Sequence, residues 1–266
     1  MKAPIIKPVI EPILDFVRSR GVSVKSATQI FMQFHVLKHL NWSTARFMGG
    51  TALVMGYQNP RFSEDVDLTH VKKPLALKEA LLKASQEIET WLGDPVNLLA
   101  PNKSTNSTWR LICQHSEADS TRLHIDSQIY PAHSTRPLVV EFPSLNPIVV
   151  QALSLQEILA EKILALAYRR YLGGRDLFDI WYHCFRHSDW ELQFVEIQKY
   201  LKLKLKDRKI SEQDLWTHLE KRVGGSADLT RARQEWMRYL PHQFQQDSIF
   251  SEILNRSKFL MSFRKI

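Results

Sequence analysis

The 266-residue sequence contains only two cysteines, Cys113 and Cys184. Two are too few for a disulfide framework or a cysteine-rich zinc site, so we expect a reducing, cytoplasmic environment. Prolines and acids interrupt the first stretch, MKAPIIKPVIEPILDF, which argues against a signal peptide. Long apolar runs are also missing, since none approaches the ~18 residues of a membrane span, and we expect no membrane partner.

Several enzyme signatures are absent as well. The sequence has no Walker A motif, no Rossmann glycine fingerprint and no G-x-S-x-G, which disfavours P-loop, dinucleotide-binding and serine-hydrolase enzymes. What is present is an ordinary folded composition, 44% hydrophobic and 24% charged, with a formal charge of +8. That charge favours polyanionic partners such as nucleic acid, although it also fits a basic protein without one.

Hydrophobic periodicity divides the chain into a mixed half and a helical half. In the first half the pattern predicts helices over 26–41, 51–57 and 75–92, and strands over 65–71, 107–115, 121–130 and 137–142. Beyond Pro147 the strand signals fade, and helices are predicted over 154–171, 175–186, 190–205, 211–223, 227–239 and 246–261. We therefore predict an α+β fold, with a small mixed sheet and flanking helices in residues 1–147 and a helical domain in 148–266.

A carboxylate pair is the most informative local feature. In a strand, Asp65 and Asp67 point to one face and Val66 to the other. Two acids at this spacing favour a bound cation, and oxygen ligands suit Mg²⁺ or Mn²⁺. The alternative is a solvated pair on an edge strand. Asp126, on the polar face of a later strand, is a candidate third ligand for two divalent ions, or simply a surface acid.

A double glycine precedes the short helix at 51–57. Gly49 and Gly50 could let backbone amides and a helix N-terminus receive a phosphate, although a plain turn is the alternative. Arg61 and Ser63 lie four and two residues before Asp65, near enough to serve the same cleft, or they are ordinary surface residues.

Lys162 interrupts the apolar stripe of the helix at 154–171. Its ammonium either extends to solvent or enters a cleft, where a compact charge suits a β- or γ-phosphate. Taking this charge as unpaired, we expect Lys162→Ala to weaken NTP binding with little loss of stability. Asp176, which follows Gly173-Gly174, could instead cap the next helix, on which Asp179 lies one turn further.

At this point the motifs resemble a known family. The pattern GG-x10-RFSEDVDL, followed by ALSLQEILAEKILALAYRRYLGGRDLFDI, closely resembles the AbiEii-type nucleotidyltransferase toxins of the DNA polymerase β-like nucleotidyltransferase superfamily. The resemblance covers about residues 45–185. It implies that residues 1–147 form the nucleotidyltransferase domain and that the helical domain completes the active-site cleft.

The resemblance also implies roles for individual residues. Asp65 and Asp67 would be catalytic metal ligands, Gly50 and Ser63 would contact the triphosphate, and Lys162 with Asp176 or Asp179 would be needed for activity. We add Asp126 as a third metal ligand from its strand context. From their positions we add Gly49 and Arg61 to the nucleotide-binding set, together with Lys162 and Asp179.

The expected function is that of a metal-dependent nucleotidyltransferase toxin of a toxin–antitoxin pair. It would use Mg²⁺ or Mn²⁺, transfer NMP from an NTP to an acceptor and release pyrophosphate. The family resemblance makes the tRNA 3′ end the leading acceptor and a cognate antitoxin a partner. The alternatives are transfer to a protein hydroxyl and a non-catalytic regulatory protein that binds nucleic acid.

A basic tract, KYLKLKLKDRK at 199–209, is the candidate acceptor surface. If it tracks RNA phosphates, replacing Lys202, Lys204 and Lys206 by serine should weaken transfer to tRNA and flatten its salt dependence. The alternative is a solvated helix end.

Overall fold

The computed structural model describes residues 10–71, 76–102, 107–116, 119–186, 190–224 and 226–260. The chain forms two compact units that interleave along the sequence. The sheet unit comprises Met1–Phe47, Glu64–Tyr130 and Pro137–Gln151, and the helical unit comprises Met48–Ser63, Pro131–Arg136 and Ala152–Ile266. Compactness alone does not test independent folding, so a domain division at residue 147 stays a prediction.

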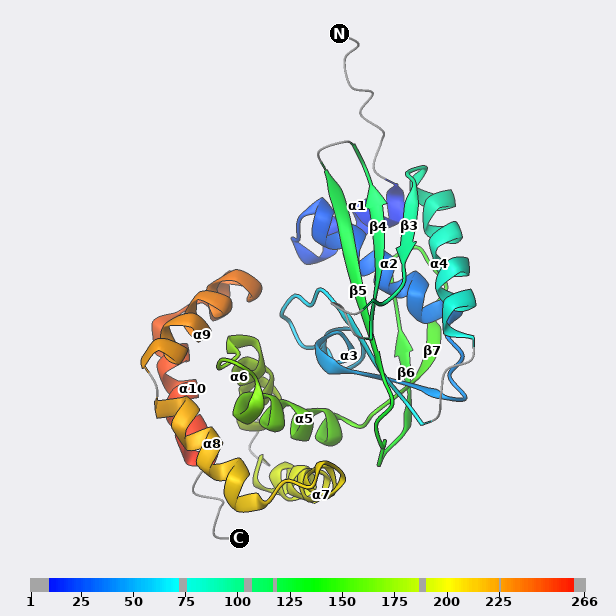
Figure 1. Cartoon of the computed structure of the whole chain (residues 1–266). Helices are drawn as coiled ribbons and strands as arrows, with labels where there is room; N and C mark the ends of the chain where they lie inside the picture. The colour runs from blue at the N-terminus through cyan, green and yellow to red at the C-terminus, as the bar shows by residue number, and fades with distance from the viewer. Residues whose placement is uncertain are drawn as a thin grey trace. The chain divides into compact units, whose positions relative to one another are not determined.

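A mixed sheet forms the centre of the sheet unit (Figure 1). In the described ranges its strands are β1 (Ala45–Met48), β2 (Val66–His70), β3 (Val96–Leu99), β4 (Thr108–Gln114), β5 (Ser120–Gln128), β6 (Arg136–Val140) and β7 (Ile148–Ala152). Their spatial order is β3-β4-β5-β2-β1-β7-β6. Strands β2 and β5 are parallel, whereas β4 is antiparallel to both β3 and β5. The predicted α+β fold with a mixed sheet is confirmed.

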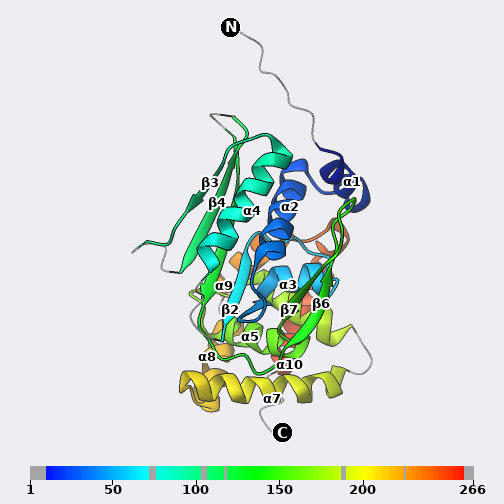
Figure 2. The same cartoon turned by 90° about the vertical axis from the view of Figure 1, so that its right-hand side faces the viewer.

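Two long helices cover one face of this sheet. Helix α2 (Val24–His39) packs against α4 (Leu77–Leu92) and β5, and α4 packs against β3; Figure 2 shows α2 and α4 side by side. A shorter helix, α1 (Glu11–Arg20), packs on α2. Phe142 joins these elements, because its ring stacks on Phe16 at 4.9 Å and meets Phe31 edge-on at 5.5 Å.

The helical unit is built around one apolar core. Its helices are α3 (Gly49–Gly56), α5 (Leu155–Tyr168), α6 (Gly174–Ile180), the π-helix Trp181–Phe185, α7 (Trp190–Arg208), α8 (Glu212–Gly224), α9 (Ser226–Tyr239), the 3₁₀ turn His242–Phe244 and α10 (Asp247–Leu260). Phe178 meets Trp236 and Phe244 edge-on, each at 5.3 Å. A Cβ on Gly174 would lie 2.1 Å from the Ala232 carbonyl oxygen, so only glycine lets α6 approach α9 this closely.

The helices and strands predicted from periodicity are present, but four elements, α1, β1, β3 and β7, were not predicted. Helix α1 forms despite the prolines, because Pro12 lies in the first turn, where its missing N–H is not needed. Strand β3 is short, and β7 follows Pro147, where we expected no further strand. In the ranges given above, no helix combines the length and apolar character that a membrane span requires.

Candidate active site

The three predicted metal ligands lie on neighbouring parallel strands of the sheet unit. Asp67 on β2 is the register partner of Asp126 on β5, and Asp65 directly precedes β2. Because side chains alternate along a strand, Asp65 and Asp67 share a face and the fully buried Val66 and Ile125 lie on the other. The face-sharing predicted from the D-x-D spacing is thus present in the structure, and Asp126 joins it through the register.

Hydrogen bonds hold two of these carboxylates. The Thr108 hydroxyl donates to Asp126, and His124 Nδ1 lies 3.3 Å from Asp65 Oδ1. The hydrogen bond to Asp65 raises the pKa of His124 against the opposing effect of its partial burial. The Asp65 side chain is 38% exposed. Carboxylate oxygens are the ligands that a hard cation such as Mg²⁺ or Mn²⁺ prefers, but in the described ranges the oxygens of these three acids are not all within 4.8 Å of one another.

The double glycine in the helical unit is packed against two side chains of its own motif. A Cβ on Gly50 would lie 2.4 Å from Arg61 Nη2 and 2.8 Å from Ser63 Oγ. The Thr51 hydroxyl donates to Ser63 Oγ at 2.9 Å, and Gly49 has a φ of 75° at the start of α3. A side chain at position 50 would therefore displace Arg61 and Ser63 from the helix start.

Arg61 is buried and forms a bidentate ion pair with Asp179 on α6. Its Nε and Nη2 donate to the two carboxylate oxygens at 2.6 and 2.8 Å, and Asn59 Nδ2 donates to Oδ1 at 2.9 Å. Burial alone would raise the pKa of Asp179, but the charges of Arg61 and Lys162 outweigh it and lower the pKa to about 2. Asp179 is thus an ionised, fully buried anchor for the segment that carries Arg61.

Lys162 is also buried, and it is paired. Its Nζ lies 2.7 Å from Asp176 Oδ1 and 3.0 Å from Asp179 Oδ2. Arg169 Nη1 donates to the second oxygen of Asp176 at 2.7 Å, and these two cations lower the pKa of Asp176 against its complete burial. The expectation that Lys162 carries an unpaired charge was wrong, because α6 supplies two carboxylates. The N-cap of α6 is Gly173, and Asp176 is an ion-pair partner instead.

These residues form one network, the buried ion cluster, made of Arg61, Lys162, Arg169, Asp176 and Asp179. Three cations against two carboxylates leave a formal charge of +1. Arg169 is the exposed end, with 55% of its side chain accessible. The cluster can therefore hold the Gly50 motif rigid and attract an anion at its open end.

Two buried side chains of this region went unrecognised in the sequence. Asn59 binds Asp179, and its Nδ2 also lies 3.2 Å from His183 Nε2. Asn59 could have been found as the start of the stretch NPRFSED, which already contains Arg61 and Ser63. His183 had no local signal, because it lies on the π-helix that follows α6.

The basic tract at 199–209 is only partly a free surface. Lys204 is 2% exposed and pairs with Glu157 at 2.7 Å and Glu161 at 3.2 Å, and Arg208 also pairs with Glu161. The expectation that Lys204 faces an acceptor was therefore wrong, since α5 occupies that side of α7. The exposed lysines are instead Lys199, Lys202, Lys206 and Lys209.

Each unit thus brings together part of the predicted set. In the sheet unit these residues are Asp65, Asp67 and Asp126, and in the helical unit Gly49, Gly50, Arg61, Ser63, Lys162, Asp176 and Asp179. Their roles in binding and catalysis stay predictions.

Comparisons with known proteins identify the family and the fold of the chain. Residues 37–256 match the family described as nucleotidyl transferase AbiEii toxin, type IV TA system. No curated protein is detectably similar in sequence. Among solved structures, the nucleotidyltransferase toxin MenT4 of Mycobacterium tuberculosis H37Rv is similar in fold, with a TM-score of 0.56, 16% identity, and coverage of 94% of this chain and 98% of that one.

A second similar structure is JHP933 from Helicobacter pylori, with a TM-score of 0.52, 17% identity, and coverage of 91% of this chain and 94% of the other. At these identities the structures support the fold alone, whereas the family match covers most of the chain. It includes the glycine motif, the carboxylate strand and the buried ion cluster. The chain accordingly belongs to the AbiEii nucleotidyltransferase toxin family of type IV toxin–antitoxin systems, and it is a nucleotidyltransferase.

Proposed function

We propose that this nucleotidyltransferase toxin requires Mg²⁺ or Mn²⁺ and transfers NMP from an NTP to the 3′ end of tRNA in the cytoplasm, with release of pyrophosphate. Membership of the family implies an NTP substrate and an antitoxin partner. The observation that carries the metal requirement is the register of Asp67 with Asp126 beside Asp65, which gathers three carboxylates on one strand face.

Asp65, Asp67 and Asp126 would hold the divalent ions. When bound, such ions neutralise the triphosphate and activate the attacking hydroxyl. Asp65 is separated from Ser63 by a single residue, Glu64, so the carboxylate strand and the glycine motif are adjacent in the chain.

The glycine motif would receive the triphosphate. Gly49 and Gly50 begin α3, where the first backbone N–H groups have no helical acceptor, and the Ser63 hydroxyl lies beside Gly50. Arg61 would act as a positioning residue, because its guanidinium is committed to Asp179 and to the Phe62 carbonyl oxygen. Keeping Gly50 without a side chain leaves room for this packing.

Lys162 can contribute to phosphate binding without leaving its partners. An ammonium has three hydrogens, and the ion pairs to Asp176 and Asp179 use two directions. Asp176 and Asp179 would then orient the lysine, while Arg169 adds positive charge at the exposed end of the cluster. In this arrangement the buried ion cluster positions one ammonium for the nucleotide.

The acceptor surface would be one face of α7. Lys199, Lys202 and Lys206 are exposed and lie at i, i+3 and i+7, so they share a face of the helix. A row of lysines on one face suits the phosphate backbone of an RNA and carries no base specificity.

The test is the incorporation of labelled NTP into total tRNA and total protein by the purified chain, with and without a chelator. We expect Mg²⁺-dependent label at the tRNA 3′ end, lost in Asp65→Asn and kept in Glu79→Gln, a matched neutralisation of an exposed acid on α4. Asp126→Asn should resemble Asp65→Asn if Asp126 is the third ligand.

If the label appeared in protein, the acceptor would be a protein hydroxyl and not tRNA. If neither fraction were labelled, the alternative of a non-catalytic regulatory protein that binds nucleic acid would stand. Full activity of the Asp65 variant would refute the carboxylate site.

A further inference from the structure

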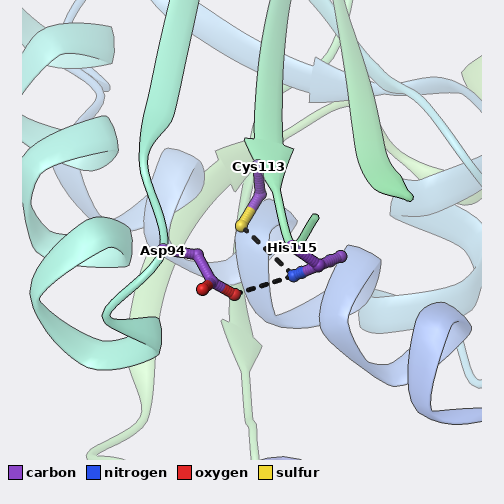
Figure 3. Close-up of side chains that lie close together, drawn as sticks. All are labelled: Asp94, Cys113 and His115. Carbon is purple, nitrogen blue, oxygen red and sulfur yellow. Dashed lines mark hydrogen bonds and ion pairs between the residues drawn. The ribbon is translucent and has the colours of Figure 1, made fainter. Parts of the chain in front are cut away.

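A second group of metal-binding side chains lies at one end of the sheet unit, apart from the carboxylates of β2 and β5. Asp94 is in the turn between α4 and β3, Cys113 is near the end of β4, and His115 follows that strand. Figure 3 shows the three side chains converging from these two segments. Their ligand atoms all lie within 4.8 Å of one another.

The distances are close to those of a metal centre. Asp94 Oδ2 lies 2.8 Å and Cys113 Sγ lies 3.9 Å from the same atom, His115 Nδ1. Ordinary zinc bond lengths and tetrahedral angles place O and N about 3.3 Å apart, and S and N about 3.6 Å apart. An ion could therefore replace the hydrogen between Asp94 and His115 with shifts of about half an ångström or less in these two distances.

The other ring nitrogen of His115 already has the partner that a metal ligand needs. His115 Nε2 lies 2.9 Å from the hydroxyl of Thr121, which is the β5 register partner of Cys113. A hydroxyl can accept a proton from Nε2, which leaves the Nδ1 lone pair directed at the centre of the group. Such outer contacts fix the tautomer and orientation of a histidine ligand.

Backbone contacts hold both segments without help from an ion. Gly93 ends α4 with a φ of 65°, and Gln114 N donates to the Pro95 carbonyl oxygen at 3.0 Å. On the other side, His115 N donates to the Asp119 carbonyl oxygen at 3.1 Å. The three ligands are thus presented by a preformed scaffold.

The burial of the group suits a bound ion with one open position. Cys113 is fully buried, whereas 13% of the Asp94 side chain and 28% of the His115 side chain are accessible. A water molecule could complete a four-coordinate ion from that side.

We propose that Asp94, Cys113 and His115 bind a Zn²⁺ ion that ties the α4–β3 turn to the end of β4. A thiolate and an imidazole select zinc over Mg²⁺, which the oxygen donors of Asp65, Asp67 and Asp126 favour. Binding releases the thiol proton of Cys113 to solvent, and the proton between Asp94 and His115 Nδ1 moves to Nε2 of the same ring. The ion stabilises the sheet unit and takes no part in nucleotidyl transfer.

The test uses the full chain, stripped with a chelator and titrated with Co²⁺ as a spectroscopic probe, then with Zn²⁺ as competitor. We expect one equivalent of Co²⁺ with a thiolate-to-cobalt charge-transfer band, and a higher melting temperature with Zn²⁺. His115→Gln and Asp94→Asn should weaken Co²⁺ binding at least about tenfold, and Thr121→Val about 10–100-fold.

Two controls separate this site from the rest of the protein. Cys184→Ala should keep the band, because burial raises the pKa of Cys184 to about 12 and keeps it a thiol. Asp65→Asn should also keep it while losing nucleotidyl transfer, so the zinc site and the proposed reaction can fail independently.

Absence of a thiolate band in the native chain would overturn the proposal. Unchanged Co²⁺ affinity in both His115→Gln and Asp94→Asn would also overturn it. In that case Asp94 and His115 would be only a hydrogen-bonded pair. These two variants change partly exposed side chains, so the test does not depend on the folding of a Cys113 variant.

Discussion

Replacing Lys162 by methionine should destabilise the helical unit by about 3 kcal/mol, at the lower end of the cost of breaking a buried ion pair. Methionine has a similar volume and opens no large cavity, so the loss is electrostatic. Both carboxylates that face Lys162 are completely buried, but Asp179 keeps Arg61 and Asp176 keeps Arg169. These remaining partners are why the lower end of the range applies.

The measurement is chemical denaturation of full-length protein, followed by tryptophan fluorescence, with a melting curve beside it. A loss of this size corresponds to about 6–12 °C in melting temperature for a protein of this size. Lys199→Met, an exposed lysine on α7, is the matched control and should change stability by less than about 0.5 kcal/mol. Adding Asp176→Asn to the Lys162 variant should recover part of the loss, because it removes one of the two buried carboxylates that lose an ion-pair partner with Lys162.

The stability difference between the Lys162→Met variant and the native chain should also depend on pH, in a direction that the pKa of Asp179 fixes. In the native chain the pKa of Asp179 is about 2, below its unfolded value of 3.8, so its contribution is complete above pH 3.8 and is lost as the pH falls toward 2. Removing Lys162 reduces that contribution, so the gap between variant and native chain should narrow below about pH 4. A Lys162→Met protein as stable as the native chain at pH 7 would refute the structural importance of the buried ion cluster.

Three further predictions follow from other parts of the chain. Gly50→Ala should reduce nucleotidyl transfer and melting temperature together, because the new Cβ would lie 2.4 Å from Arg61 Nη2 and 2.8 Å from Ser63 Oγ; unchanged NTP kinetics would contradict this. Burial lowers the pKa of His35 from 6.5 to about 4, so the unfolded chain binds this proton before the folded chain does as the pH falls. The free energy of unfolding should therefore decrease by up to about 3 kcal/mol between pH 6.5 and pH 4. In denaturation curves measured across this range, His35→Gln should reduce the dependence of stability on pH. Replacing the exposed lysines of α7 by serine should lower tRNA affinity and reduce the salt slope by about 0.7 per lost contact, while NTP affinity stays normal; an unchanged slope would exclude this face. The lysines to replace are Lys199, Lys202 and Lys206.

Features that depend on local periodicity could be predicted from the sequence. The alternation around Asp65 and Asp67 predicts a shared strand face, because side chains in a strand point to opposite sides whatever lies around them. The helices of the second half follow from 3.6-residue spacing in the same way, and the motif spacing from Gly50 to Asp67 already indicated the family. Short elements were not predicted, because β3 and β7 span only four and five residues and show too little periodicity.

Which charges meet depends on how the helices pack. The apolar stripe of α5 left open whether Lys162 extends to solvent or points inward, and its partners lie on the next helix. Asn59 likewise meets a carboxylate 120 residues away. The same holds for Lys204, which turns toward Glu157 on α5, and for His115, which meets Asp94 across 21 residues. Such pairs depend on how helices pack and strands align, and no local pattern encodes a partner so distant in the chain. For this reason the sequence could name candidate site residues, while the fold determined their contacts.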